Sequence, residues 1–458
     1  MRRRRGLTAA LVALVLAPGA YALDLDQAWQ AAQQHDLDYA AARAAHDAAQ
    51  ARRSQARALW RPNVTASGTV GRMNNTTDVS GAHFAAPGLG ASNGVNFDTS
   101  VTGGTSSSWV LSARQPLLSG ERWAQSAQLD LAADAADRQW QATRQSLMLQ
   151  TAQRYFDVVI AQETLRVLGD QQAAAEQALA QARERYRIGD SPVTDSHEAQ
   201  ARAQAVRAQV LAAQTELQLK QIELADMTGV APQELALAVP DFASGVQDPG
   251  PLDHWLEAAE RDNPDLLRQA AGTAVARQDV ARLRAISSPS LDLVARFGRD
   301  RLSGSGDYGA AANTANSAMI GLQLTVPVFT GGYRSAQHDE AVGMAEKSRD
   351  DEARARQRVA LQTRSAWLGL TVGATRVDAL AAALQASQAR LEATRLGHEV
   401  GDRSTLELLA AQSDAAAAEL ALLQGRIGLV MERLRLAALA GALDEEHFRA
   451  AVQGAAQR

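Results

Sequence analysis

The sequence contains no cysteine, and this absence excludes disulfides and thiolate metal sites. It also excludes a lipid-modified N-terminal cysteine, so any attachment to a membrane must come from the polypeptide itself. After residue 22 no run of 18 or more apolar residues occurs, so no transmembrane helix is expected. The eight histidines are scattered, and no pair has ligand spacing beside a carboxylate cluster. We therefore expect neither a metal nor a cofactor.

Proline is missing from two long tracts, 117–191 and 328–458. Both tracts are rich in alanine, glutamine, arginine, glutamate and leucine, and most of these are strong helix formers. Apolar residues recur there at three- and four-residue spacing, with alanine at many positions between them. This pattern is typical of closely packed helices of the coiled-coil kind. The sequence therefore predicts a mainly α protein.

Residues 1–22 have the layout of a secretory signal peptide. Arg2–Arg5 form the basic region, Leu7–Leu16 the apolar region, and Ala20–Ala22 a cleavage site of the A-x-A type. The alternative is an N-terminal membrane anchor, but the apolar run is too short to span a bilayer. Removal of the segment leaves 42 basic against 51 acidic residues, a net charge near −9, which argues against a nucleic-acid partner.

The remainder of the chain contains an internal duplication. Matching positions lie 227 residues apart at the start of each copy, and 211 or 212 residues apart further along. They are Pro62-Asn63-Val64 and Pro289-Ser290-Leu291, Gln115–Gly120 and Val326–Gly331, Tyr155 and Trp367, Ile188–Asp190 and Val400–Asp402, and Gly229 and Gly441. A unit of this length is too long for a solenoid repeat. We predict two tandem repeats, 23–251 and 252–458.

Each repeat is expected to contain a helix, a β-hairpin, a long helix and a half-length helix. The expected helices are 25–60, 120–188, 192–227, 252–286, 331–399 and 404–440. Gly189 and Gly401 end the long helices, and Ser404-x-x-Glu407 forms a capping box. Each long helix runs about 100 Å, as far as two shorter helices placed end to end. A long helix beside two stacked half-length helices fits these lengths.

The two hairpins, 63–118 and 290–328, contain strands with alternating polarity. The apolar positions in the first strand are Val64, Ala66, Gly68 and Val70, and those in the last are Ile320, Leu322, Leu324 and Val326. One apolar and one polar face over about ten residues is typical of an outer-membrane barrel strand. The alternative is a half-buried hairpin in a soluble domain. The signal peptide and the absence of a globular core sequence favour the membrane strand.

The segments 73–104 and 303–316 are rich in glycine, serine and asparagine, and we expect them to be exposed outer loops. Four strands cannot close a barrel, and open sheet edges are not tolerated in lipid. The chain must therefore assemble. A homotrimer with twelve strands would form a wide, water-filled tube, in which a small β-barrel continues into a long α-helical barrel.

Several short motifs, in this order and spacing, resemble the TolC family of outer-membrane channel proteins across essentially the whole mature chain. They are Leu25–Ala32, Pro62-Asn63-Val64, Gln115–Gly120, Tyr155–Val158, Arg185–Gly189 and their second-copy counterparts. The resemblance implies a trimeric channel-tunnel in the outer membrane that extends into the periplasm. It further implies passive drug or small-molecule efflux, or type I protein secretion, without catalysis. The partners would be a periplasmic adaptor and an inner-membrane pump of the RND, ABC or MFS type. Segments 228–251 and 441–458 would lie around the equator of the tube.

The resemblance also implies a gate at the far ends of the helices. Carried over by position, Thr194 and Asp195 would meet Arg403 and His398. Arginine–carboxylate bonds suit a latch because they fix orientation yet exchange readily for water or a partner. Since His398 stands where a family member has tyrosine, the latch is a candidate for pH sensitivity.

By the same resemblance, Glu407 would supply an acidic ring at the gate. Ala410 stands where a family member has a second acidic residue, so one acidic ring is expected rather than two. A purely structural interpretation is also open. Glu407 is explained by the capping box, and Asp195 lies in a first helical turn, where a carboxylate is favoured.

Other functional classes fit the sequence less well. A periplasmic adaptor, or a structural coiled-coil protein of an envelope complex, also uses long helical hairpins, but an adaptor normally carries one hairpin between β-rich halves. The duplicated hairpins disfavour the adaptor, and the alternation typical of membrane strands counts against a structural protein. A secreted enzyme is disfavoured because Asp195-Ser196-His197 are adjacent on one helix and cannot form a nucleophile–base–orienter chain.

Overall fold

The computed structural model describes residues 23–88, 90–231, 249–306 and 309–453, and the chain divides into two compact units. Unit 1 comprises Met1–His46, Asp137–Arg268 and Glu352–Arg458, and unit 2 comprises Asp47–Ala136 and Gln269–Asp351. Each unit contains residues of both predicted repeats. The predicted signal peptide and most of segment 228–251 lie outside the described residues. Within the described ranges, no helix combines the length and apolarity needed to cross a membrane.

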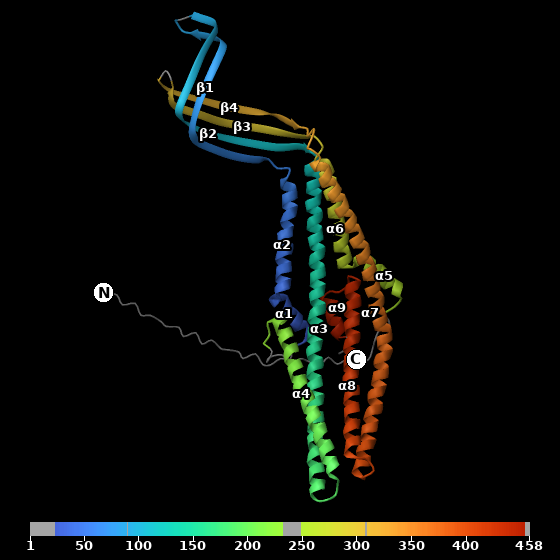
Figure 1. The fold of residues 1–458 in the computed structure, drawn as a ribbon. Coiled ribbons are helices and arrows are strands. Elements are labelled where there is room, and N and C mark those ends of the chain that lie inside the picture. Colours follow the sequence, from blue (N-terminus) through green and yellow to red (C-terminus); the bar gives the residue numbers. More distant parts are fainter. Residues whose placement is uncertain (1–22, 89, 232–248, 307–308, 454–458) are drawn as a thin grey trace, which may run out of the picture. The chain divides into compact units, whose positions relative to one another are not determined.

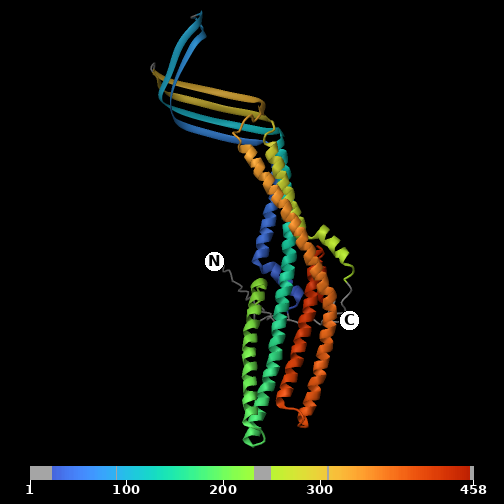
Figure 2. The ribbon, with the colours of Figure 1, turned by 45° about the vertical axis from the view of Figure 1, so that its right-hand side comes forward.

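Unit 2 holds an antiparallel sheet with the strand order β1-β2-β3-β4. The strands are β1 (Asn63–Ala86), β2 (Gly90–Ser119), β3 (Ser290–Gly306) and β4 (Gly309–Thr325). Pro62 and Pro289 directly precede β1 and β3, where the missing N–H of proline removes no ladder bond. Strands β1 and β2 are the longer pair, with 24 and 30 residues against 17 in β3 and in β4. Figures 1 and 2 show β1 and β2 extending past β3 and β4 with a pronounced bend.

The prediction of outer loops at 73–104 and 303–316 is wrong for most of their length. Strands β1 and β2 cover 73–86 and 90–104, and β3 and β4 cover 303–306 and 309–316. The polar residues pair across the hairpin because a continuous ladder outweighs weak strand propensity. Register shifts accommodate the irregular sequence, as between Met73 and Asn75.

Nine helices are present in the described ranges, and Figure 1 labels them. They are α1 (Leu25–His35), α2 (Leu37–Ala58), α3 (Gly120–Arg187), α4 (Val193–Thr228), α5 (Leu252–Asp262), α6 (Pro264–Ala285), α7 (Tyr333–Glu399), α8 (Thr405–Leu439) and α9 (Glu445–Gln453). The long helices α3 and α7 have 68 and 67 residues, which confirms the predicted pair of long helices. Helix α9 lies within the predicted C-terminal segment 441–458.

The predicted helices 25–60 and 252–286 are each interrupted once, which corrects the prediction. Asp36 ends α1 and its carboxylate accepts the N–H of Tyr39 at 2.7 Å. Asn263 ends α5 and its amide oxygen accepts the N–H of Leu266 at 2.9 Å. Each side chain caps the next helix, so the chain changes direction without leaving those two N–H groups unpaired.

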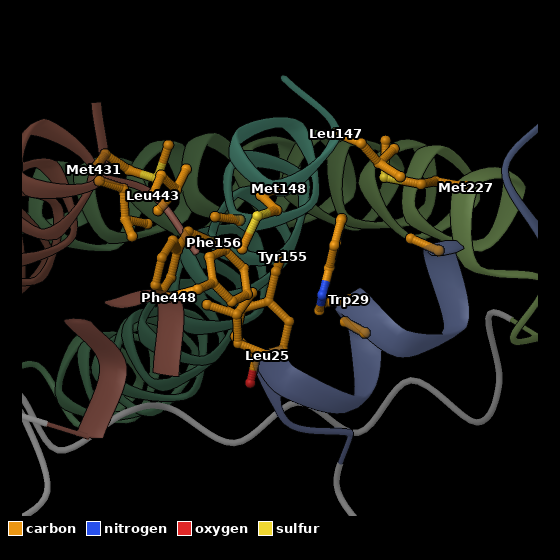
Figure 3. Close-up of a cluster of buried hydrophobic side chains, with 14 of the residues drawn as sticks. Leu25, Trp29, Leu147, Met148, Tyr155, Phe156, Met227, Met431, Leu443 and Phe448 are labelled. Carbon is orange, nitrogen blue, oxygen red and sulfur yellow. The ribbon is translucent and has the colours of Figure 1, made fainter. Parts of the chain in front are cut away.

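The core of unit 1 is an aromatic and aliphatic cluster with residues from both predicted repeats. Figure 3 shows its side chains converging from α1, α3, α4, α8 and α9. Trp29 meets Phe448 with ring centroids 6.1 Å apart, and Tyr155 meets Phe156 at 5.6 Å. All four aromatic side chains are fully buried. The cluster therefore packs helix α9 against helix α1.

Candidate functional site: the helix-hairpin tips and the membrane sheet

Unit 1 contains two helical hairpins, α3/α4 and α7/α8, whose tips are built alike. Gly189 and Gly401 both adopt positive φ, 81° and 84°, the left-handed conformation that favours glycine. The N–H of Asp190 donates to the Arg185 carbonyl at 2.8 Å, and that of Asp402 donates to Gly397 at 2.8 Å. The two turns that the sequence matched, 188–190 and 400–402, therefore have the same backbone geometry.

The second tip carries the predicted capping box. The Ser404 hydroxyl accepts the N–H of Glu407 at 3.2 Å, and the N–H of Ser404 donates to the Glu407 carboxylate at 2.8 Å. The Arg403 guanidinium donates to the other carboxylate oxygen of Glu407 at 2.9 Å. The Ser404 N–H, the Arg403 guanidinium and the Ser404 hydroxyl, in this order, lower the pKa of Glu407. The structural interpretation of Glu407 is therefore confirmed in this chain.

Arg403 is held by two further contacts at this tip. A Cβ atom on Gly397 would stand 2.7 Å from Cγ of Arg403, so the arginine stem lies directly on the glycine. Nδ1 of His398 lies 3.0 Å from the Arg403 carbonyl oxygen. Since a carbonyl only accepts, Nδ1 carries a proton in this bond. Sequence reasoning missed Gly397, and its lack of a side chain six residues before Arg403 was the available signal.

The first tip has a separate set of contacts. The Thr194 hydroxyl lies 3.4 Å from the Asp195 carboxylate in the first turn of α4. In the described part of this chain, neither residue has a hydrogen bond or ion pair with His398 or Arg403. The five predicted gate residues therefore form two local groups here. Their pairing across the gate stays a prediction for the assembled channel.

In unit 2, the register places the apolar positions of all four strands on one face of the sheet. Ala66 pairs with Leu111, Leu111 with Phe297, and Ala295 with Ile320. The large side chains on this face are solvent-exposed in the chain, with Ile320 at 75%. They include Val64, Val70, Trp109, Leu111, Leu293, Phe297, Ile320, Leu322 and Leu324. The alternation predicted for the first and last strands thus extends to all four.

The opposite face of the sheet carries most of the polar side chains, together with a few apolar ones such as Val110 and Met319. Its register positions include Thr65, Ser112 and Arg296. Arg114 on β2 forms an ion pair with Asp292 on β3, and the Asp292 side chain is 2% exposed. A buried carboxylate needs such a partner because burial alone penalises its charge. Sequence reasoning missed this pair, since the two residues lie 178 positions apart.

Aromatic side chains lie on the apolar face and close to the strand ends that join the helices. Trp109 and Phe297 pack edge to face with centroids 5.5 Å apart, and Trp60 packs similarly on Trp123 at 6.4 Å. Phe329, just after β4, is 87% exposed. Interfacial aromatic residues of this kind are typical of membrane barrels. No cluster of three side chains able to hold a metal ion occurs in the ranges that the structure describes.

Comparison with known proteins places this geometry in a family. A family model described as outer membrane efflux protein matches residues 28–230 and 255–442. The chain is 28% identical to outer membrane protein TolC of Vibrio cholerae, over 72% of this chain and 76% of that protein. It is 26% identical to proteases secretion protein PrtF of Dickeya chrysanthemi, over 97% of this chain and 94% of that protein.

Solved structures share the fold. The CmeC outer membrane channel of Campylobacter jejuni matches with a TM-score of 0.72 at 17% identity, over 91% of this chain and 85% of that chain. The outer membrane protein VceC of Vibrio cholerae matches with a TM-score of 0.70 at 18% identity, over 91% of this chain and 96% of that chain.

The chain belongs to the outer membrane efflux protein family. It is a TolC-related channel of the outer membrane that extends into the periplasm and serves as an export conduit. The resemblance noted in the sequence is confirmed.

Proposed function

We propose that three copies of the chain form one channel, and that its passive transport involves no catalytic step. The observation that carries this proposal is a sheet with one apolar face and two edge strands, β1 and β4, without a neighbour in the described chain. In lipid an open edge is costly, because each unpaired backbone group loses several kcal/mol of hydrogen bonding. Since β1 and β4 run in opposite directions, β4 of one copy is able to extend the antiparallel ladder onto β1 of the next.

The helices complete the conduit. Each copy contributes the hairpins α3/α4 and α7/α8 from two tandem repeats, 23–251 and 252–458. In the trimer these hairpins line a tunnel that continues from the barrel. The tips meet a periplasmic adaptor that links the channel to an inner-membrane RND, ABC or MFS pump, which supplies the energy. The tips themselves carry the gate, in which Asp195 and Thr194 meet Arg403 and His398 of a neighbouring helix pair.

The cargo is either a small molecule or a secreted polypeptide. PrtF and the alkaline protease secretion protein AprF of Pseudomonas aeruginosa, both named for protease secretion, match 97% and 94% of this chain. Other relatives are named TolC or outer membrane efflux protein. A deletion strain tested for drug sensitivity and for secreted proteins separates the two cargo classes. Loss of secretion alone assigns the polypeptide branch, and drug sensitivity alone assigns efflux.

Assembly is tested on the purified full-length protein. Unheated gel electrophoresis and native mass spectrometry should both give the mass of three chains, and planar bilayers should show a channel conductance. Protein that inserts into outer-membrane vesicles yet remains monomeric would refute the trimer.

A further inference from the structure

The apolar face of the sheet ends in three arginines. Arg72 on β1 follows Val70 by two residues, and Arg299 on β3 follows Phe297 by two residues. Arg301 lies two residues further along β3. Since side chains of a strand alternate between faces, all three share the face of Val70 and Phe297. They lie on the hairpin side of the apolar band, away from the strand ends that join the helices.

The register brings these arginines together. Arg301 pairs with Ser107, and Ser107 pairs with Val70, which lies two residues before Arg72. Adjacent strands lie about 5 Å apart and residues of one face about 7 Å apart along a strand. The three side chains therefore reach into one surface region, which we call the arginine patch (Arg72, Arg299 and Arg301).

Nothing in the described chain neutralises the arginine patch. The three side chains are exposed, and no ion pair involves them among the described residues. Their cross-strand neighbours are uncharged: Trp109 and Asn316 beside Arg299, Ser107 and Thr314 beside Arg301, and Thr105 beside Arg72. Arg114, on the opposite face, shows the contrast because it is paired with Asp292.

The position of the patch indicates its ligand. Trp109 and Phe297, packed edge to face, lie where the apolar band meets the arginines, as aromatic residues do at a membrane interface. In a channel whose helices extend into the periplasm, this end of the band lies at the outer leaflet. Guanidinium groups bind phosphate through paired N–H donors, and they do so best when few competing carboxylates are near.

We propose that the arginine patch binds the phosphate groups of an anionic lipid of the outer leaflet, of the lipopolysaccharide class. The patch fixes the height of the channel in the membrane, because the lipid phosphates and the apolar band then lie at matched depths. This inference rests on the proposed barrel, since it needs the apolar face of the sheet to contact lipid.

The test compares two variants of the full-length protein. In the first, Arg72→Gln, Arg299→Gln and Arg301→Gln are combined. In the matched control, Arg296→Gln removes a neighbouring arginine of β3 on the polar face. Binding of fluorescent lipopolysaccharide to the detergent-solubilised protein is titrated. Since one arginine at an anionic lipid surface strengthens binding about fivefold, the triple variant should bind about 100-fold more weakly. The control should bind as the unmodified protein does.

Two further arms locate the source of the phosphate. Excess inorganic phosphate should not displace the labelled lipid, and vesicles of phosphatidylcholine should not compete. Displacement by free phosphate would assign an ion site instead and overturn the proposal, as would equal binding by the triple variant and the unmodified protein.

Where the triple variant fails to assemble, Arg301→Gln alone should weaken binding about fivefold, and unchanged binding would likewise overturn the proposal. A wild-type chain that forms no trimer would refute the proposed assembly, whereas an intact trimer with unaltered binding in the variants refutes only this inference.

Discussion

Gly229 lies so close to His35 that a Cβ atom on the glycine would stand 2.6 Å from the imidazole Nδ1. In the predicted second repeat, Gly441 lies similarly close to Asp262, whose carbonyl oxygen would be 2.2 Å from the added Cβ. His35 and Asp262 are the last residues of α1 and α5, and both glycines have positive φ, 71° and 70°. The duplicated glycines therefore allow the end of each half-length helix to pack on the end of a short helix.

Gly441→Ala should destabilise the protein more than Gly229→Ala. Both substitutions place alanine in the left-handed region, at a cost of about 1–2 kcal/mol. At 441 the added carbon also meets backbone, which has no other rotamer, whereas at 229 it meets a side chain that is able to turn. The apparent Tm of the purified channel measures the effect. Gly250→Ala is the matched control, because its φ is 75° with nothing within 4 Å of an added Cβ. Equal shifts for all three variants would contradict the packing argument.

The duplicated aromatic residues Tyr155 and Trp367 make equivalent tethers. The Tyr155 hydroxyl donates to the Leu23 carbonyl at 3.2 Å, and the Trp367 indole N–H donates to the Gly250 carbonyl at 2.9 Å. Tyr155→Phe keeps the buried ring and removes one hydrogen bond, so it should cost about 1 kcal/mol. Tyr155→Ala should cost about 3–5 kcal/mol, because it leaves a cavity in the core. Thermal unfolding of the two variants tests this difference, and similar losses for both would show that the ring contributes little.

The ion pair between Arg114 and Asp292 should respond asymmetrically to substitution. Arg114→Gln leaves a buried carboxylate without its charged partner, so it should destabilise the sheet by about 1–3 kcal/mol. Asp292→Asn leaves a half-exposed guanidinium that water is able to solvate, so its effect should be smaller. The temperature at which the trimer dissociates measures both. If Asp292→Asn lowered this temperature more than Arg114→Gln, the argument that the carboxylate is the buried partner would be wrong.

The cap at the second tip should weaken in acid. Folding lowers the pKa of Glu407, so the cap is fully formed above the ordinary carboxyl pKa and is lost as the pH falls through the lowered value. Hydrogen exchange of the Ser404 and Glu407 amides should therefore become less protected at low pH. Glu407→Gln is the control, since an amide does not titrate in this range. Protection that falls equally in both proteins would show that Glu407 is not the titrating group.

The proposed latch makes a further prediction, for conductance. Arg403→Ser and Asp195→Ala should each raise the closed-state current in planar bilayers, because each removes one half of a charged pair in the assembled channel. Arg390→Ser is a matched control. It breaks an ion pair with Asp414 in the same helical hairpin, further from the tip. Unchanged current in both latch variants would leave Arg403 and Glu407 with a capping role alone.

The long helices were predictable because proline is absent from both tracts and glycine ends them at Gly189 and Gly401. The interruption at Asn263 was missed although Pro264 directly follows it and disfavours helix at the preceding residue, whereas around Asp36 neither proline nor glycine marks the break. Each break is stabilised by a local side-chain cap and by the packing of Gly229 or Gly441, and only the glycine contact is distant in sequence. The composition of 73–104 predicted a loop, but most of this segment forms strands, because cross-strand pairing rather than intrinsic preference decides its structure. At the gate, the capping box was readable from four consecutive residues, whereas any pairing between hairpins depends on assembly.

The unequal lengths of the strands have a consequence for what lies outside the cell. In the proposed trimer, three tall β1/β2 hairpins alternate with three short β3/β4 hairpins around the mouth of the tube. The outer rim of such a trimer would then repeat every third of a turn. An antibody or a phage protein that binds the tall hairpins would therefore have three equivalent sites, each formed by β1 and β2.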